Sequence, residues 1–176
     1  MMFVSLGLGA AVAIALIVVV SVLTGGNVSS TTTAPPALVG TTLPSLTEGG
    51  LHGTTVSAPW NHHQATAVIF FASWCEPCKT ELPALAHYLA THSLGKVAVL
   101  GVDTQDQLSA GQAVVARDHL TFPVFFDPAS TVAAGKFQLG ALPDTAFVTA
   151  TGKVQDLHIG PISATQFAAA VAALNA

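Results

Sequence analysis

The chain has two cysteines, Cys75 and Cys78, and both lie in one short segment directly after a continuous apolar run. That run, Thr66–Ala72, is rich in β-branched and aromatic residues, which is typical of a strand buried on both faces. After the cysteines, apolar residues recur at helical spacing, at Leu82, Leu85, Ala86 and Leu89. The segment therefore predicts a strand, a loop and a helix, with the cysteine pair at the start of the helix.

This position favours redox chemistry. Unpaired N–H groups and the dipole at a helix N-terminus stabilise an anion and lower a thiol pKa, so Cys75 is the predicted exposed nucleophile. Cys78 follows three residues later on the same helix face and can bond to it. Cys75 would attack a partner's disulfide, and Cys78 would resolve the mixed disulfide. Pro77 suits the first helical turn, where its missing N–H is not needed.

Two other uses of the cysteine pair stay open at this point. A closed zinc site needs four ligands, and the chain has no second cysteine pair, although it has seven histidines. Two of them, His62 and His63, lie just before the apolar run. A purely structural disulfide across so short a loop constrains little chain entropy. Redox work is the interpretation that both the motif and its position favour.

The rest of the folded part alternates between strand-like and helix-like segments. Further strands are predicted at Lys96–Val102, Phe122–Phe126, Thr145–Ala150 and Val154–Gly160, and further helices at Asp106–Leu120 and around Val132–Lys136. Gly111 weakens the first of these helices. Thr151-Gly152-Lys153 is typical of a hairpin turn, and Ser163 with Gln166 forms a capping box that opens a last helix. The order predicts one α/β domain with a mixed sheet.

The beginning of the chain has a different composition. None of the five basic and nine acidic residues precedes Glu48, and Phe3–Leu23 is almost wholly apolar. About 20 apolar residues cross a hydrocarbon core of about 30 Å, whereas a cleaved signal peptide has an apolar region of only about 7–15 residues. We expect a transmembrane anchor at 1–24, or an uncleaved signal, then a flexible Ser/Thr/Pro/Gly linker at 25–42 and the folded domain at 43–176. The net charge of −4 argues against a nucleic-acid partner.

The segment FFASWCEPCKTELP, residues 70–83, resembles the active-site segment of thioredoxin-like proteins, specifically the membrane-anchored TlpA/ResA/DsbE branch. Residues 122–154 resemble the later half of that branch. The resemblance implies a thioredoxin-like fold, a central mixed sheet flanked by helices, with an N-terminal hairpin and a helical insertion. It also implies work on protein disulfides at the outer side of a bacterial membrane. The redox-active disulfide Cys75–Cys78 needs no other cofactor or metal. A membrane electron donor would supply the electrons that reduce it.

The resemblance also implies roles for individual residues. Pro143 matches a cis proline that faces the cysteine pair, and the backbone of Leu142 would pair with an extended substrate. Glu81 matches an acidic residue near the resolving cysteine. General thioredoxins carry a buried acid six residues before the first cysteine, where this chain has Ile69. Glu81 is then the candidate for the acid–base role beside Cys78, which makes Cys75, Cys78 and Glu81 the predicted catalytic residues.

Trp74, Glu76 and Pro77 complete the predicted docking surface with the residues at 142 and 143. The charge of Glu76 should oppose a thiolate at Cys75 and make the couple more reducing, although it also suits the dipole of the helix start. Asp144 either biases the docking groove against acidic partners or is a solvated turn residue, and the sequence leaves both interpretations open.

The leading hypothesis is an extracytoplasmic thiol–disulfide oxidoreductase. The resemblance suggests that it reduces protein disulfides, such as those of apocytochrome c during cytochrome c maturation. One alternative on the same chemistry is an oxidase or isomerase of secreted proteins. An alternative outside enzymes is a copper-binding metallochaperone, although related copper-delivery domains space their cysteines by three residues and this chain by two. A peroxidase is disfavoured, because Arg117 is the single arginine.

Overall fold

The computed structural model describes residues 38–176. The predicted anchor at 1–24 and most of the predicted linker lie outside the described residues, so these remain predictions. Within the described part, no helix combines the length and apolarity that crossing a membrane needs.

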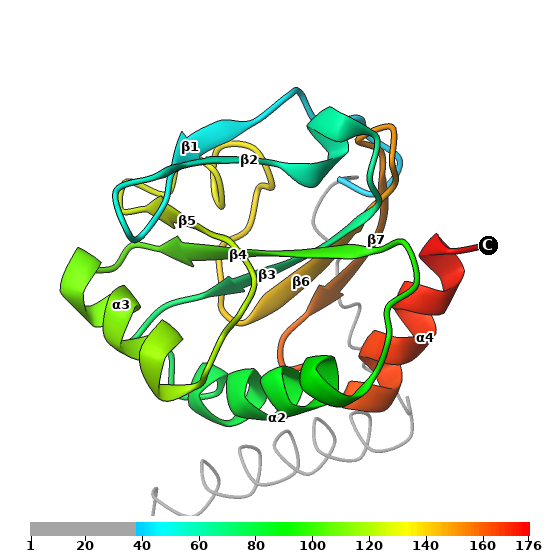
Figure 1. Cartoon of the computed structure of the whole chain (residues 1–176). Helices are drawn as coiled ribbons and strands as arrows, with labels where there is room; N and C mark the ends of the chain where they lie inside the picture. The colour runs from blue at the N-terminus through cyan, green and yellow to red at the C-terminus, as the bar shows by residue number, and fades with distance from the viewer. Residues whose placement is uncertain (1–37) are drawn as a thin grey trace, which may run out of the picture. The chain divides into compact units, whose positions relative to one another are not determined.

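A five-stranded mixed sheet forms the centre of the domain, with strands in the order β5-β4-β3-β6-β7 (Figure 1). The strands are β3 (Thr66–Phe71), β4 (Ala98–Thr104), β5 (Val124–Asp127), β6 (Asp144–Val148) and β7 (Val154–Ile159). β3 pairs in parallel with β4 and antiparallel with β6, and β6 and β7 form the predicted hairpin. This arrangement confirms the predicted α/β fold with a mixed sheet.

Helices α2 (Cys78–Thr91), α3 (Leu108–Arg117) and α4 (Ala164–Leu174) cover one face of the sheet (Figure 1). The hairpin of β1 (Thr47–Gly49) and β2 (Thr55–Ser57), the 3₁₀ helix η1 (Pro59–His62) and the segment before β6 lie toward the other face.

Every side chain of β3 is buried, and alternate residues enter opposite cores. Ile69 and Phe71 pack in the cluster that contains Leu82, whereas Phe70 packs against Phe137 on the other side. Burial on both faces explains why the strand is a continuous apolar run rather than an alternating one.

One predicted element is wrong. Residues 131–136 form successive turns instead of a short helix, because some N–H groups reach back five residues, such as that of Phe137 to the Val132 carbonyl. The buried Asp127 carboxylate organises these turns, since it accepts hydrogen bonds from the N–H groups of Val132 and Ala133 at 3.1 and 2.9 Å.

The last helix begins with the predicted capping box. Ser163 Oγ accepts from the N–H of Gln166 at 3.3 Å, and Gln166 Oε1 accepts from the N–H of Ser163 at 3.0 Å. Replacing Ser163 by Ala should lower the free energy of unfolding by about 1 kcal/mol, because the N–H of Gln166 loses its acceptor. Chemical denaturation measures the loss. Ser45→Ala, at an exposed position, is the control, and an equal loss in both variants would contradict the role of the cap.

Candidate active site

Cys75 and Cys78 form a disulfide between the end of β3 and the start of α2, with their Cα atoms 5.3 Å apart. The N–H of Cys78 donates to Cys75 Sγ at 3.2 Å, and the N–H of Cys75 donates to the Ala72 carbonyl at 3.2 Å. α2 begins at Cys78, with Pro77 as its cap. Pro77 was predicted in the first turn of the helix, but it is the N-cap, one position before that turn. Cys75 lies in the loop just before the helix.

The disulfide is almost closed off from solvent. Cys75 is 3% exposed and Cys78 is 1% exposed. Both pack in an apolar cluster whose members include Ile69, Phe71, Ala72, Leu82 and Leu85. The prediction of an exposed Cys75 is wrong for this oxidised form, because bonding to Cys78 holds the Cys75 sulfur against the cluster.

Glu81 lies one helical turn after Cys78, on the same side of α2, and is 5% exposed. Its Oε2 accepts a hydrogen bond from the N–H of Ile162 at 2.7 Å, whereas Oε1 has no partner among residues 38–176. Burial raises the pKa of the Glu81 carboxyl above its ordinary value. Ile69 is buried in the same cluster as the cysteines and has no titratable group. Glu81, one turn after Cys78, has one.

A second buried acid, Asp144, begins β6 and accepts from the N–H of Gly160 at 2.9 Å. The interpretation of Asp144 as a solvated turn residue is wrong, because strand pairing buries it. Burial raises the pKa of Asp144. Its charge raises the pKa of Glu81, and His158 lowers the pKa of both carboxyls. His158, which the sequence analysis left without a role, pairs with Thr145 in the β6–β7 hairpin.

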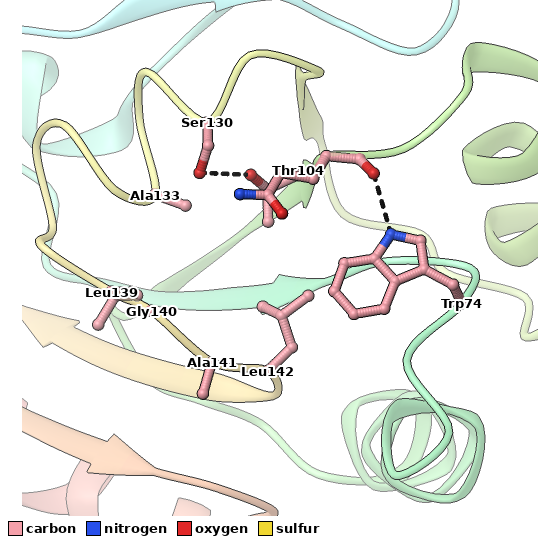
Figure 2. A pocket seen from close by; sticks show the side chains of 9 residues that line it. Trp74, Thr104, Ser130, Ala133, Leu139, Gly140, Ala141 and Leu142 are labelled. Atoms are coloured by element: carbon pink, nitrogen blue, oxygen red, sulfur yellow. Dashed lines mark hydrogen bonds between the residues drawn. The ribbon is translucent and has the colours of Figure 1, made fainter.

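On the other side of the disulfide, Trp74 and Leu142 line a pocket of about 50 Å³ (Figure 2). Trp74 is 56% exposed, and its indole N–H donates to the Gln105 carbonyl at 2.9 Å. The Leu142–Pro143 peptide bond is cis, as the resemblance implied. The remaining lining residues are Leu139 and six small or polar residues: Thr104, Gln105, Ser130, Ala133, Gly140 and Ala141. Two of the predicted docking residues thus share one cavity.

Glu76 does not belong to that pocket. Its carboxylate is exposed and forms an ion pair with Lys79 Nζ at 2.6 Å, one turn along α2. Solvent and the Lys79 charge both weaken its influence on Cys75.

The contact that anchors the loop before the cysteines was not predicted from the sequence. The Asp106 carboxylate accepts hydrogen bonds from the N–H and from the hydroxyl of Ser73, the second at 2.8 Å. A signal was present, because the carboxyl ends of parallel strands meet at one edge of a sheet. Residues just after β4 therefore lie beside residues just after β3.

Both cysteines are held in the disulfide. Across residues 38–176, no three His, Cys, Asp or Glu side chains come close enough together to hold a metal ion.

Comparison with known proteins gives a consistent result. Residues 39–157 match the model of the AhpC/TSA family. The chain is 30% identical over 131 residues to a thiol:disulfide interchange protein DsbE homolog of Paracoccus denitrificans, covering 73% of this chain and 70% of that one. It is 28% identical over 119 residues to sporulation thiol-disulfide oxidoreductase A of Bacillus subtilis, covering 66% of this chain and 71% of the relative.

Solved structures share the fold. A thiol:disulfide interchange protein from Chlorobium tepidum superposes with a TM-score of 0.67 at 23% identity, over 81% of this chain and all of that one. A secreted disulfide oxidoreductase of Mycobacterium tuberculosis gives a TM-score of 0.63 at 23% identity, over 73% of this chain and 96% of its own.

The raised pKa of Glu81 makes a prediction about stability. A folded-state pKa above the ordinary value means that the native state binds the proton more tightly than the unfolded chain does. The contribution of Glu81 to stability is therefore fully present below the unfolded pKa and is lost as the pH rises through the folded pKa. Relative to the wild type, Glu81→Gln should gain stability as the pH rises, measured by denaturation at several pH values.

Glu76→Gln removes an exposed carboxylate from the same helix start and is the matched control. A Glu81→Gln curve that departs from the wild-type curve no more than the Glu76→Gln curve does would show that Glu81 does not titrate as a buried acid.

Proposed function

The chain belongs to the AhpC/TSA family and is a thioredoxin-like thiol–disulfide oxidoreductase, and we propose that it reduces disulfides of proteins outside the cytoplasm, apocytochrome c among them. The observation that carries the proposal is the buried carboxyl of Glu81, one turn after Cys78. Its Oε1 accepts no hydrogen bond from any described residue. Such a group can accept a proton from the resolving thiol.

The proposed reaction starts from the dithiol form. The Cys75 thiolate attacks one sulfur of the substrate disulfide, so that a mixed disulfide forms and a substrate thiolate leaves. Glu81 accepts the proton of the Cys78 thiol, and the Cys78 thiolate then attacks Cys75 Sγ. The second substrate sulfur leaves as a thiolate, and the two substrate thiolates take up two protons, one from Glu81 and one from solvent, which received the proton of Cys75. Two electrons pass to the substrate, which becomes a dithiol, and the Cys75–Cys78 disulfide of the structure is the product. No further cofactor is needed.

The direction of electron flow rests on buried charge rather than on Glu76. A carboxyl group has no positive charge to stabilise a thiolate, and when ionised it destabilises one. This effect on the thiolate is stronger in a low-dielectric interior than at the surface. Glu81 and Asp144 are such buried carboxyls, whereas Glu76 is exposed and paired with Lys79. A poorly stabilised thiolate gives a more reducing couple, which supports a reductase over an oxidase.

The pocket between Trp74 and Leu142 supports substrate docking beside the disulfide. In the proposed complex, an extended substrate segment pairs with the Leu142 backbone and places a side chain in this pocket. A cavity of about 50 Å³ fits a small side chain, so residues near the substrate cysteine should be small.

We place the domain at the outer face of the membrane, held by an anchor at residues 1–24 through the linker at 25–42. The length of the apolar run Phe3–Leu23 supports an anchor. A membrane electron donor then returns the disulfide to the dithiol after each turnover.

The reduction potential tests the direction of electron flow. The full-length chain in mild detergent is equilibrated with dithiothreitol or glutathione buffers, and the oxidised fraction is measured by alkylation of free thiols. We expect a potential below about −220 mV, toward the value of about −270 mV for thioredoxin. A potential near about −120 mV, that of a strong disulfide donor, contradicts the reductase and supports the oxidase alternative.

Trapping tests the substrate. Cys78→Ser, kept reduced, should form a stable mixed disulfide through Cys75 with an oxidised peptide that carries the CxxCH motif of apocytochrome c, because the resolving thiol is gone. Mass spectrometry identifies the adduct. Cys75→Ser, which should give no adduct, is the matched control. If Cys78→Ser traps an unrelated disulfide protein but not this peptide, the apocytochrome substrate is wrong although the chemistry stands.

A further inference from the structure

Asp103, near the end of β4, is 0% exposed, and neither carboxyl oxygen meets an N–H or O–H donor among the described residues. An ionised carboxylate in such a place is strongly unfavourable. Burial, together with the neighbouring Asp106 charge, raises the pKa of Asp103 to about 8. Near neutral pH the group is therefore mostly a carboxylic acid, which has one O–H to donate.

The helix above Asp103 leaves room for this acid. Gly111 lies in α3 against the Asp103 carboxyl, and a Cβ at Gly111 would collide with Oδ2. Glycine within a helix is unfavourable, and the carboxyl accounts for its presence here. The groups facing Asp103 from the other elements are apolar: Leu51 before β2, and the register partners Phe71 on β3 and Phe126 on β5.

Among the described residues, the charged group that acts on Asp103 is Asp106, which lies within hydrogen-bonding reach. In its protonated form Asp103 has one O–H, which it can donate to the Asp106 carboxylate. The same carboxylate accepts from the N–H and the hydroxyl of Ser73, two residues before Cys75. A second hydrogen bond joins the same two loops, because the Trp74 indole N–H donates to the Gln105 carbonyl. A chain of contacts thus runs from the buried acid to the loop that carries the nucleophile.

We propose that Asp103 and Asp106 share one proton and position the active-site loop, so that ionisation of Asp103 weakens the hold of Asp106 on Ser73 and opens Cys75 to attack. While the proton is shared, the pair carries one negative charge, and the Asp106 carboxylate keeps its geometry. When the proton leaves, a second negative charge forms on buried Asp103 beside the half-buried Asp106 carboxylate, and the two charges repel each other.

Asp103 is thus a positioning residue that acts through Asp106. It supplies a buried acid on β4, whereas β3 carries apolar Ile69 six residues before Cys75. This inference rests on the thiol–disulfide chemistry of the site and not on the proposed substrate. Failure of the peptide-trapping experiment therefore leaves it untouched.

The test compares wild-type chain with Asp103→Asn, whose amide can donate to Asp106 at every pH. The rate at which dithiothreitol reduces the Cys75–Cys78 disulfide is measured from pH 6 to about pH 9.5, a window that spans the titration of Asp103. The ratio of the two rates cancels the ionisation of dithiothreitol and of Glu81 and Asp144, which both proteins share. We expect the ratio of the wild-type reduction rate to that of the variant to rise roughly fivefold as the pH passes through about 8. This is the effect of losing one hydrogen bond.

Asp156→Asn, at an exposed position on β7, is the control, and its ratio to the wild type should stay constant. If the ratio for folded Asp103→Asn also stays constant with pH, the proposal is overturned.

If Asp103→Asn does not fold, a second measurement that does not need this variant tests the proposal. In a Trp60→Phe background the emission of Trp74 alone reports on the loop, and it should change near pH 8. Ser73→Ala should reduce this change, because the loop loses one of its bonds to Asp106. Emission without a transition in this range overturns the proposal.

Discussion

The parallel pairing of β3 with β4 is the constraint on which the rest of the site depends. Both strands run toward the same edge of the sheet, so whatever follows one of them lies beside whatever follows the other. β3 is followed by Ser73, Trp74 and the disulfide, and β4 by Gln105 and Asp106. The bonds from Ser73 to Asp106 and from Trp74 to Gln105 join these two exits, so the loop geometry follows directly from strand order.

Around this edge the domain buries carboxyls although charged residues make up only 8% of the chain. Glu81 is buried on α2 one turn after Cys78, Asp144 is buried at the start of β6, and Asp103 is buried on β4. Each has a raised pKa because an apolar setting disfavours its charged form. The three carboxyls therefore keep their protons to a higher pH than exposed carboxyls do, which suits a reaction in which thiols and disulfides interconvert.

Local patterns were enough to predict much of this arrangement. The apolar run of β3, the cysteine spacing, the β6–β7 turn and the Ser163 capping box are each set by neighbouring residues, and the structure has all of them. Burial of Asp103 and Asp144 was not predictable in this way. An acid is typical of a surface or a turn, and only packing from distant elements such as α3 and the β6–β7 pair encloses these two. Pairing of Glu76 with Lys79 likewise depends on side-chain conformation.

The contact between Gly111 and Asp103 has a consequence for how this site can change. Any side chain at position 111 needs the space that the carboxyl occupies, and a smaller, apolar residue at 103 leaves a void under α3. The two positions are eight residues apart in sequence, and a change of side-chain volume at one of them requires a compensating change at the other. Across diverging descendants of this chain, glycine at 111 should accompany an acid at 103, and loss of one should be followed by loss of the other.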